Sequence, residues 1–221
     1  MSKELVAKEI AKRFKNNEVV GLGSGSTTEL ALIEVGKRIK NENLTIFGVP
    51  TSARTAVIAE QNGIIVLNPL TKKEISWAFD GADEVDPAKN MIKGRGAAML
   101  VEKIIAKSAK KFVIIVSEDK LVSKLGEKFS VPVEVIPSAL SYVERELKNF
   151  KASEVVLRES SGKYGPVVTE QNNFVLDVKF TEIATDLESK LKSITGVVES
   201  GLFIGLNPEV LVSKGQEVVK I

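Results

Sequence analysis

The sequence predicts an α/β protein in which a parallel, doubly wound sheet is joined to a second, smaller α+β part. Three observations lead to this fold class. Apolar strand-like runs alternate with amphipathic helix-like runs through the first half of the chain. A glycine-rich turn links the first strand to the helix that follows it. Beyond residue 127 the alternation gives way to short strands separated by turn residues.

The first half of the chain builds strand–helix–strand units. An amphipathic helix is expected at residues 3–14, where apolar side chains recur on one face. The same criteria predict strands at 19–22, 44–49, 64–67, 75–79 and 112–116, and helices at 28–39, 52–61 and 97–109. We expect the strands to pair in parallel, because each helix returns the chain to the end of the sheet at which the previous strand began.

The second half changes character. Residues 131–137 are extended and interrupted by prolines, and a helix at 138–148 follows with Ser138 as its expected N-cap. Further predictions are strands at 155–158, 167–169 and 174–179, a helix at 186–193, and strands in 201–221 that return to the first part. The expected domains are a main one of residues 1–127 and 204–221, and a small one of residues 128–203 at a subunit interface.

Composition limits the functional classes. The 221 residues carry a net charge of +2 with acids and bases interspersed, which gives no support for binding nucleic acid or a membrane. No apolar run has the length of a membrane span and the first residues do not resemble a signal peptide, so we expect a cytoplasmic protein. The chain has no histidine and no cysteine, which excludes Ser-His-Asp triads, thiol nucleophiles and ordinary zinc sites. Any proton transfer must therefore use carboxylate, lysine, tyrosine or water.

Charged residues gather just after the predicted strand at 75–79. Asp80 and Asp83 flank two small residues, Lys93 follows in a glycine-containing turn, and Glu102 lies on the next predicted helix. In open α/β sheets, ligands bind where the strands end and loops gather. The stretch from Asp80 onward is therefore the candidate site.

Glu102 has the setting of a general base. Its helical neighbours three and four residues away are Ala98, Met99, Ile105 and Ala106, all apolar, whereas the lysines at 103, 107 and 110 fall on a different side. Burial without a charged partner raises the pKa of a carboxyl group towards the range that a general base needs. The competing interpretation is a half-exposed glutamate at the edge of the apolar stripe.

The glycine-rich turn at 21–27 is a candidate anion site, because backbone N–H groups at a helix N-terminus attract phosphate and glycine lets it come close. Its spacing does not fit G-x-G-x-x-G, since residue 26 is serine, and the Walker lysine is absent. The next strand ends in Pro-Thr-Ser rather than in an acid, which disfavours NAD. A tight turn that binds nothing is the alternative.

The acids after the strand also admit other interpretations. Aspartates commonly stabilise turns, so Asp80 and Asp83 have a purely structural alternative. Asp80, Asp83, Glu84 and Asp86 together could hold magnesium, but EF-hand spacing is absent, and we predict no metal. Lys93 is either a solvated loop lysine or a cation aimed at a developing oxyanion, while the lone Lys120 is either surface charge or a phosphate contact.

Several motifs of this sequence belong together: Gly23-Ser-Gly-Ser-Thr27, Asp80-Gly-Ala-Asp83, Lys93-Gly-Arg-Gly96 with Ala97-Ala98, Glu102-Lys-Ile-Ile105, Val131-Pro-Val-Glu-Val-Ile-Pro137, Gly196-Val-Val and Gly201-Leu-Phe. Through these motifs the chain resembles ribose-5-phosphate isomerase, type A, over nearly its whole length. One departure is Arg95, where many members have glycine, which could alter the entrance of the site.

The resemblance implies a Rossmann-like domain with an inserted ferredoxin-like one, assembled as a homodimer or homotetramer. It implies interconversion of ribose 5-phosphate and ribulose 5-phosphate without metal or cofactor, with Glu102 moving a proton between C1 and C2 through a cis-enediolate. Asp80, Asp83 and Lys93 would help to open the furanose ring and stabilise the enediolate. The implied substrate contacts are Ser24, Gly25, Ser26, Thr27, Asp80, Gly81, Ala82, Asp83, Lys93, Gly94, Arg95, Gly96 and Lys120.

Two rival functions come from other classes. A sugar-phosphate-sensing module of a transcription regulator would need a DNA-binding segment, but the helix at 3–14 stands alone and the net charge is near zero. A CoA-transferase-like enzyme would use Glu102 as a nucleophile, which an acyl-exchange assay would reveal. Neither rival explains Asp80, Asp83 and Lys93 together.

Overall fold

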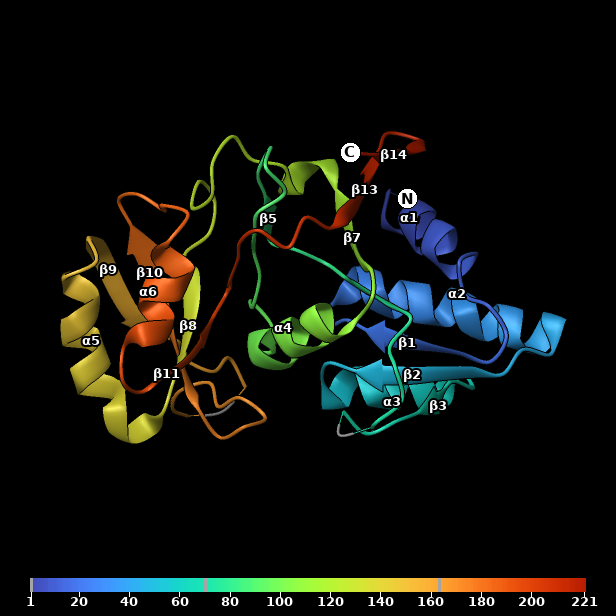
Figure 1. Cartoon of the computed structure of the whole chain (residues 1–221), viewed down its shortest axis with the longest axis horizontal. Helices are drawn as coiled ribbons and strands as arrows, with labels where there is room; N and C mark the ends of the chain where they lie inside the picture. The colour runs from blue at the N-terminus through green and yellow to red at the C-terminus, as the bar shows by residue number, and fades with distance from the viewer. Residues whose placement is uncertain (1, 70, 163) are drawn as a thin grey trace. The chain divides into compact units, whose positions relative to one another are not determined.

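The computed structural model describes residues 2–69, 71–162 and 164–221, and its chain falls into two units (Figure 1). The first unit is Met1–Ala82, Val101–Lys120 and Pro208–Ile221; the second is Asp83–Leu100 and Leu121–Asn207. Relative to the predicted domains, residues 83–100, 121–127 and 204–207 are grouped with the second unit rather than the first. The placement of the small domain at a subunit interface stays a prediction.

The first unit contains a seven-stranded sheet in the order β14-β13-β7-β4-β1-β2-β3. All neighbours pair in parallel except β13 and β14, which are antiparallel. If the six parallel strands are numbered in chain order, their order across the sheet is 3-2-1-4-5-6, which is the Rossmann order expected for a doubly wound sheet. The strands are β1 (Glu18–Leu22), β2 (Ile46–Pro50), β3 (Ile65–Val66), β4 (Trp77–Asp80), β7 (Phe112–Ser117), β13 (Glu209–Lys214) and β14 (Glu217–Lys220).

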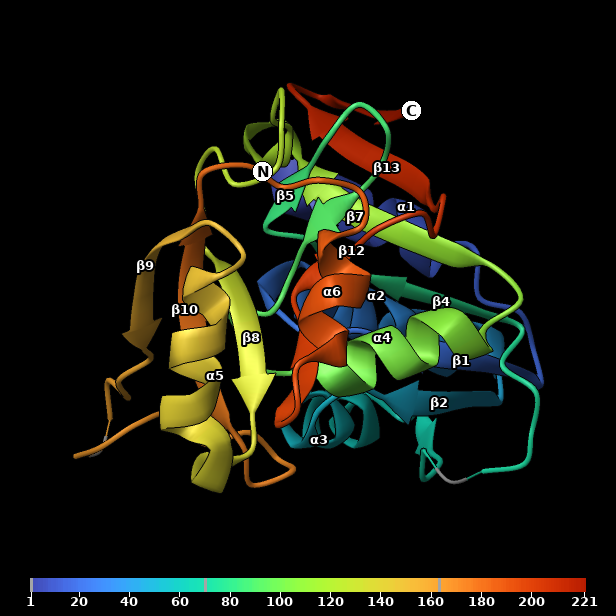
Figure 2. The same cartoon turned by 60° about the vertical axis from the view of Figure 1, so that its left-hand side comes forward.

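Helices cover both faces of this sheet, because its strands alternate apolar side chains to the two sides. On one face α1 (Ser2–Ala11), α2 (Ser26–Glu42) and α3 (Ala53–Gln61) bury residues such as Ile10, Leu32 and Ile58 against β1, β4 and β7. On the other face α4 (Met99–Ser108) places Ile105 against Val49 and Ala78. Figure 2 shows α4 in front of the strands with α2 behind them.

The second unit contains a four-stranded antiparallel sheet in the order β11-β8-β10-β9. Its elements follow the chain order β8-α5-β9-β10-α6-β11, which is the split βαβ arrangement of ferredoxin-like folds. Both helices pack on one face over a core of Val133, Leu147, Leu176 and Leu191. The elements are β8 (Val131–Val135), α5 (Leu140–Lys148), β9 (Ala152–Leu157), β10 (Phe174–Phe180), α6 (Leu187–Ser193) and β11 (Val197–Ser200). The Rossmann-like and ferredoxin-like predictions are thus confirmed.

A third, small sheet of the second unit was not predicted. It has the order β12-β6-β5, from β5 (Glu84–Val85), β6 (Met91–Ile92) and β12 (Leu202–Phe203). Each strand has two residues, too short for a periodic pattern to show in the sequence. Because β6 ends next to Lys93, this sheet fixes the start of the turn that carries the lysine.

Three local predictions in the second unit were wrong. Ser138 caps no helix: Pro137–Ala139 forms a 3-10 turn, and α5 begins after Ala139 without a side-chain cap. Residues 167–169 make only an isolated bridge from Val168 to Phe174. Prolines do not break residues 131–135, because Pro132 lies within a continuous strand and Pro137 follows that strand's end.

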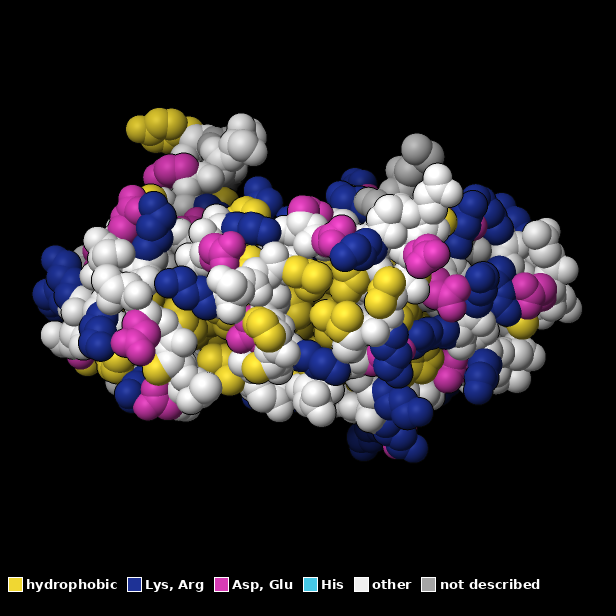
Figure 3. Space-filling view, turned by 90° about the horizontal axis from the view of Figure 1, so that it is seen from above, with side chains coloured by type: hydrophobic (Ala, Val, Ile, Leu, Met, Phe, Trp, Pro, Cys, Tyr) yellow, Lys and Arg dark blue, Asp and Glu magenta, His cyan; other side chains and the backbone are white. Residues whose placement is uncertain are grey.

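Charge is mixed on the surface, as the composition suggests. On the face shown in Figure 3, basic and acidic side chains are interspersed. Among the described residues, no helix combines the length and the apolar composition that a membrane span requires.

Candidate active site

The glycine-rich turn lies at the point where the order of the parallel sheet reverses. From β1 the chain continues to β2 and β3 on one side, whereas β4 pairs with the other edge of β1. In doubly wound sheets a crevice opens at the carboxyl ends of the two strands that flank this reversal. Residues 23–25 follow β1 and Asp80 ends β4, so both lie at that crevice.

Asp80 is bound to the turn through backbone groups. One carboxylate oxygen accepts hydrogen bonds from Ser24 N–H at 3.0 Å and Gly81 N–H at 2.7 Å, and the side chain is only 2% exposed. The Gly23 N–H also donates to the Phe79 carbonyl at 2.9 Å. A Cβ atom on Gly23 would lie 2.3 Å from the Asp80 carboxyl carbon, so only glycine allows the two segments to approach this closely.

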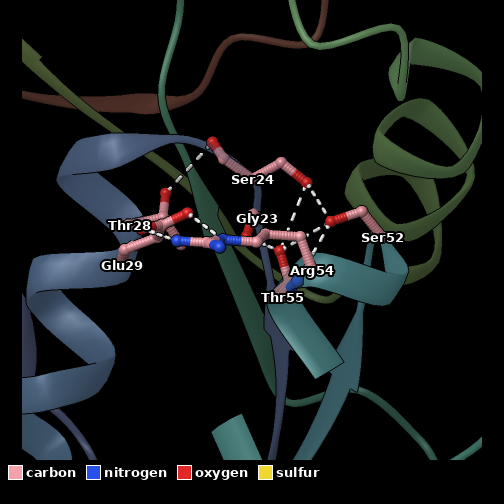
Figure 4. Close-up of polar contacts among 7 residues, drawn as sticks. All are labelled: Gly23, Ser24, Thr28, Glu29, Ser52, Arg54 and Thr55. Atoms are coloured by element: carbon pink, nitrogen blue, oxygen red, sulfur yellow. Dashed lines mark hydrogen bonds and ion pairs between the residues drawn. The ribbon is translucent and has the colours of Figure 1, made fainter. Parts of the chain in front are cut away.

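A cluster of hydroxyl groups surrounds Ser24 (Figure 4). Its Oγ lies 2.7 Å from Thr51 Oγ1, 3.0 Å from Ser52 Oγ and 3.3 Å from Thr55 Oγ1. Ser52 caps α3 by accepting from the Thr55 N–H, and the Thr55 hydroxyl donates to the Gly23 carbonyl at 3.0 Å. The Thr51 hydroxyl likewise donates to the Leu22 carbonyl at 3.0 Å. A hydroxyl has one proton, so Ser24 and Ser52 are the members of this cluster that can donate to an anion.

The amino end of α2 adds backbone donors and a cation. Gly25 precedes the helix with φ 108° and forms no side-chain cap, so the first N–H groups of α2 have no intrahelical partner. Such N–H groups bind phosphate. Lys3 on α1 donates from Nζ to Ser26 Oγ at 2.9 Å, which brings positive charge to this helix end.

An ion pair ties the starts of α2 and α3 together. Arg54 donates to both carboxylate oxygens of Glu29 at 3.0 and 3.1 Å (Figure 4). This hydrogen bonding raises the pKa of Arg54 above its ordinary value. The pair thus links the first turns of α2 and α3, although Arg54 is largely exposed.

Glu102 is buried, as the helical spacing predicted. It lies in the first turn of α4 and is 5% exposed. Its helix packs closely on β1, since a Cβ atom on Gly21 would lie 2.4 Å from Ile105 Cγ2. Lys103 is buried too, at 2%, and does not share the exposure of Lys107 and Lys110. Helical spacing placed Lys103 on another side of the helix but could not show that this side is also covered.

Lys120 ends the 3-10 turn Glu118–Lys120 that follows β7. Its side chain is 23% exposed and its Nζ lies 3.8 Å from a carboxylate oxygen of Asp119. β7 is the parallel neighbour of β4, so Lys120 follows the carboxyl end of a strand beside the one that ends in Asp80.

Gly81 and Ala82 follow Asp80 in the first unit, whereas Asp83 and residues 93–96 belong to the second unit. Lys93 is 3% exposed, its N–H donates to the Gly201 carbonyl at 2.8 Å, and its Nζ lies 5.6 Å from the centre of the Phe203 ring. Asp83 accepts from the Arg95 N–H at 3.2 Å, and the Asp83 N–H donates to the carbonyl of the last residue of β6 at 2.8 Å. The structure thus brings Asp83 to the turn at 93–96.

Arg95 contacts an aromatic ring, and the acidic side chains beyond Asp83 accept hydrogen bonds from nearby amide groups. The Arg95 guanidinium lies 4.7 Å from the centre of the Phe129 ring. Glu84 is fully buried and accepts from the N–H groups of Gly126, Lys128 and Phe129 at 2.6–2.7 Å. Asp86 accepts from the backbone and side-chain amides of the residue four positions on. The carboxylates considered as metal ligands at 84 and 86 therefore hold loops, and the lack of a metal requirement stays a prediction.

The residues that sequence reasoning missed are the hydroxyls after β2 and the lysine on α1. Thr51 and Ser52 follow the carboxyl end of a strand adjacent to β1, which is a usable signal for a site. Lys3 gave no signal, because only the packing of α1 beside α2 brings it to the turn. In the first unit, the structure unites the turn at 24–27 with Asp80; in the second, it unites Asp83 with the turn at 93–96.

Comparisons with known proteins agree with one another. The family model for ribose 5-phosphate isomerase A (phosphoriboisomerase A) matches residues 47–217. The ribose-5-phosphate isomerase A of Thermosynechococcus vestitus is 48% identical over 215 residues, covering 96% of this chain and 91% of the relative. That of Methanothermobacter thermautotrophicus is 45% identical over 222 residues, covering 99% and 97%.

Solved structures give the same result. Ribose 5-phosphate isomerase A from Methanocaldococcus jannaschii has a TM-score of 0.95 at 43% identity, over 100% of this chain and 97% of that chain. A D-ribose-5-phosphate isomerase in complex with phospho-erythronic acid has a TM-score of 0.96 at 41% identity, with the same coverage.

Proposed function

The chain belongs to the ribose-5-phosphate isomerase A family, and on that premise we propose that it interconverts D-ribose 5-phosphate and D-ribulose 5-phosphate through a cis-enediolate. This is an aldose–ketose isomerisation of the non-oxidative pentose phosphate pathway. The observation that carries the proposal is the agreement in sequence and fold over 100% of the chain with an isomerase of this name. The reaction moves protons only, so the enzyme should need neither metal nor cofactor.

The turn at 24–27 is the proposed phosphate site. Ser24, Gly25, Ser26 and Thr27 offer hydroxyls and the first N–H groups of α2, while Lys3 and Lys120 offer positive charge. A phosphate held there anchors the part of the sugar that does not react. Binding energy from such a remote group positions the reacting carbons. The relative that binds phospho-erythronic acid, a phosphorylated sugar acid, supports this choice of ligand class.

Glu102 is the proposed base. In the forward reaction its carboxylate removes the proton from C2 of the open-chain aldose, the electrons of the broken C–H bond form the C1=C2 bond, and O1 takes the negative charge. The same proton then returns to C1, while the hydroxyl proton of O2 passes to O1 and leaves the C2 carbonyl of the ketose. Burial at 5% exposure shields the Glu102 carboxylate from water. Its role follows from chemistry and family resemblance.

Lys93, Asp80 and Asp83 take the remaining roles. Lys93 is the proposed cation for the negative charge that develops on the enediolate oxygens, usually the largest electrostatic contribution in such reactions. Asp80 and Asp83 would exchange protons with the ring oxygen and the hydroxyls as the furanose opens. The backbone of Gly81, Ala82, Gly94, Arg95 and Gly96 completes the proposed substrate contacts. Cytoplasmic location and assembly as a homodimer or homotetramer remain part of the proposal.

The decisive experiment is a direct assay of ribose 5-phosphate conversion with the wild type and Glu102→Gln. The amide cannot accept the proton, so turnover should fall by at least about 10²- to 10⁴-fold, while calorimetry still detects binding of the sugar phosphate. Glu60→Gln, a change of an exposed helical glutamate, is the matched control and should keep wild-type activity. Near-normal turnover by Glu102→Gln would refute the assigned base, and a chelator-induced loss restored by magnesium would reopen the metal interpretation.

A further inference from the structure

The turn that carries Lys93 is held from the antiparallel sheet of the second unit. Arg158 follows β9, and its Nη1 donates hydrogen bonds to the carbonyl oxygens of Gly94 at 2.8 Å and Arg95 at 3.1 Å. These are the first two carbonyls beyond the lysine. One guanidinium nitrogen therefore spans the turn immediately next to Lys93.

A second partner fixes the guanidinium itself. Asp177 on β10 accepts from Arg158 Nε at 2.8 Å and from Nη2 at 2.5 Å, a bidentate pair. Arg158 continues the strand pairing, because its N–H donates to the Val175 carbonyl at 2.9 Å. Arg158 and Asp177 are then diagonal neighbours on one face of the sheet. Their side chains are 15% and 30% exposed, so the pair is partly shielded from water.

The same face of the sheet packs directly against the turn. Pro132 on β8 pairs with Asp177, so both side chains point to this face, opposite the helices. A Cβ atom on Gly94, whose φ is 103°, would lie 3.3 Å from Pro132 Cγ. On the other flank, a Cβ atom on Gly201 would lie 2.1 Å from the Lys93 carbonyl oxygen. The backbone around Lys93 is thus confined by packing and then locked by Arg158.

We propose that Arg158, oriented by Asp177, is a positioning residue for Lys93. The inference rests on the proposed function, in which Lys93 meets the charge of the enediolate. A cation stabilises developing charge best when it is already in place, because reorganisation during the step weakens the effect. Arg158 provides this by binding the carbonyls of Gly94 and Arg95. The four-stranded antiparallel sheet therefore takes part in turnover through the backbone of the turn, without touching substrate.

The variants Arg158→Ala and Arg158→Lys test the proposal. In Arg158→Ala, kcat for ribose 5-phosphate should fall on the order of 10²-fold, while KM changes by less than about threefold. Arg158→Lys keeps the charge but cannot form the planar fork, so it should recover only part of kcat. Guanidinium ion added to Arg158→Ala should also restore part of kcat.

Lys179→Met is the matched control. Lys179 pairs with Glu154, and this ion pair joins the same two strands, β10 and β9. The variant should keep wild-type kcat and show no response to guanidinium. Hydrogen–deuterium exchange of the amides at 93–96 should accelerate in Arg158→Ala and remain unchanged in Lys179→Met.

Specific results would overturn the proposal. These are a folded Arg158→Ala with wild-type kcat, an equal loss of kcat in Lys179→Met, or a rise in KM with kcat intact. If Arg158→Ala does not fold, Asp177→Asn decides: a reduced kcat supports the proposal and an unchanged kcat overturns it. An inactive wild type would refute the proposed function alone, and exchange at 93–96 in Arg158→Ala would still show whether Arg158 holds the turn.

Discussion

Asp80 and Lys93 are both buried polar side chains of the proposed site, yet their surroundings are built differently. Asp80 ends a parallel strand, and backbone N–H groups of Ser24 and Gly81 hold its carboxylate. Lys93 follows a two-residue strand, and its turn is held by Arg158, which lies 64 residues away from Gly94 in the sequence.

The difference shows two ways of placing a functional group. At the carboxyl end of a parallel strand, the sheet dictates position, and one glycine gives the required approach. In a turn at the end of a short strand, position depends on side chains from distant segments. We call the surroundings of Asp80 the first region and the turn of Lys93 with its supporting side chains the second region. We expect the first region to lose its geometry when its backbone is crowded, and the second when its supporting side chains are removed.

The largest effect is expected from crowding the first region with Gly23→Ala. The added methyl group would overlap the Asp80 carboxyl carbon at 2.3 Å and its Cα at 2.6 Å, so the turn and Asp80 must separate. Misplacing both should lower kcat/KM by about 10²-fold or more. Steady-state kinetics measure this, with Gly162→Ala, where a Cβ atom would meet open space, as the control. Normal kinetics in Gly23→Ala would show that the site tolerates a shifted turn.

A smaller effect is expected from loosening the second region with Glu84→Gln. The Glu84 carboxylate accepts hydrogen bonds from three backbone N–H groups. The glutamine side chain has an NH2 group in place of one carboxylate oxygen, so this group would face backbone N–H donors without an acceptor. The free energy of unfolding should fall by about 2 kcal/mol, with faster amide exchange at 126–129. Glu144→Gln on α5 is the control. An unchanged exchange rate at 126–129 would contradict the supporting role of Glu84.

Ser24→Ala tests whether the turn after β1, in the first region, binds the phosphate group of the substrate. Removing the hydroxyl leaves Thr51 and Ser52 without their contact at 2.7 and 3.0 Å and takes one donor from the anion site. Because the phosphate does not react, KM should rise by about 5- to 10-fold, roughly 1 kcal/mol, with kcat nearly unchanged. Ser108→Ala on α4 should leave both constants unaltered. A lower kcat at unchanged KM would instead place Ser24 at the reacting end of the sugar.

The smallest effect is expected from an ion pair away from both regions. Arg13 donates to Glu209 at 2.7 Å and holds the pKa of that carboxyl below its ordinary value. A lowered folded-state pKa adds stability above the unfolded pKa, and this is lost as the pH falls through the folded value. Glu209→Gln should cost less than about 1 kcal/mol near neutral pH, since both side chains are partly exposed. Thermal unfolding should show the difference from wild type shrinking with acidification; a growing difference would contradict the pairing.

The sequence by itself determined the parts that depend on local pattern. Apolar periodicity gave the parallel strands and their helices, and the apolar neighbours of Glu102 correctly predicted its burial. Gly23 and Gly25 correctly marked a tight turn after β1, whereas Gly21, predicted as part of that turn, lies within the strand. These features are readable because each depends on residues within one or two helical turns of each other.

Only the tertiary structure decided which distant residues meet. It brought Thr51 and Ser52 to Ser24, buried Lys103, and set Arg158 against the turn at 93–96. No local period encodes these contacts, because they depend on strand order and register between segments far apart in the chain. The same sequence pattern that places a lysine on a helix, or an arginine after a strand, fits an exposed side chain equally well until the packing of the whole fold is known.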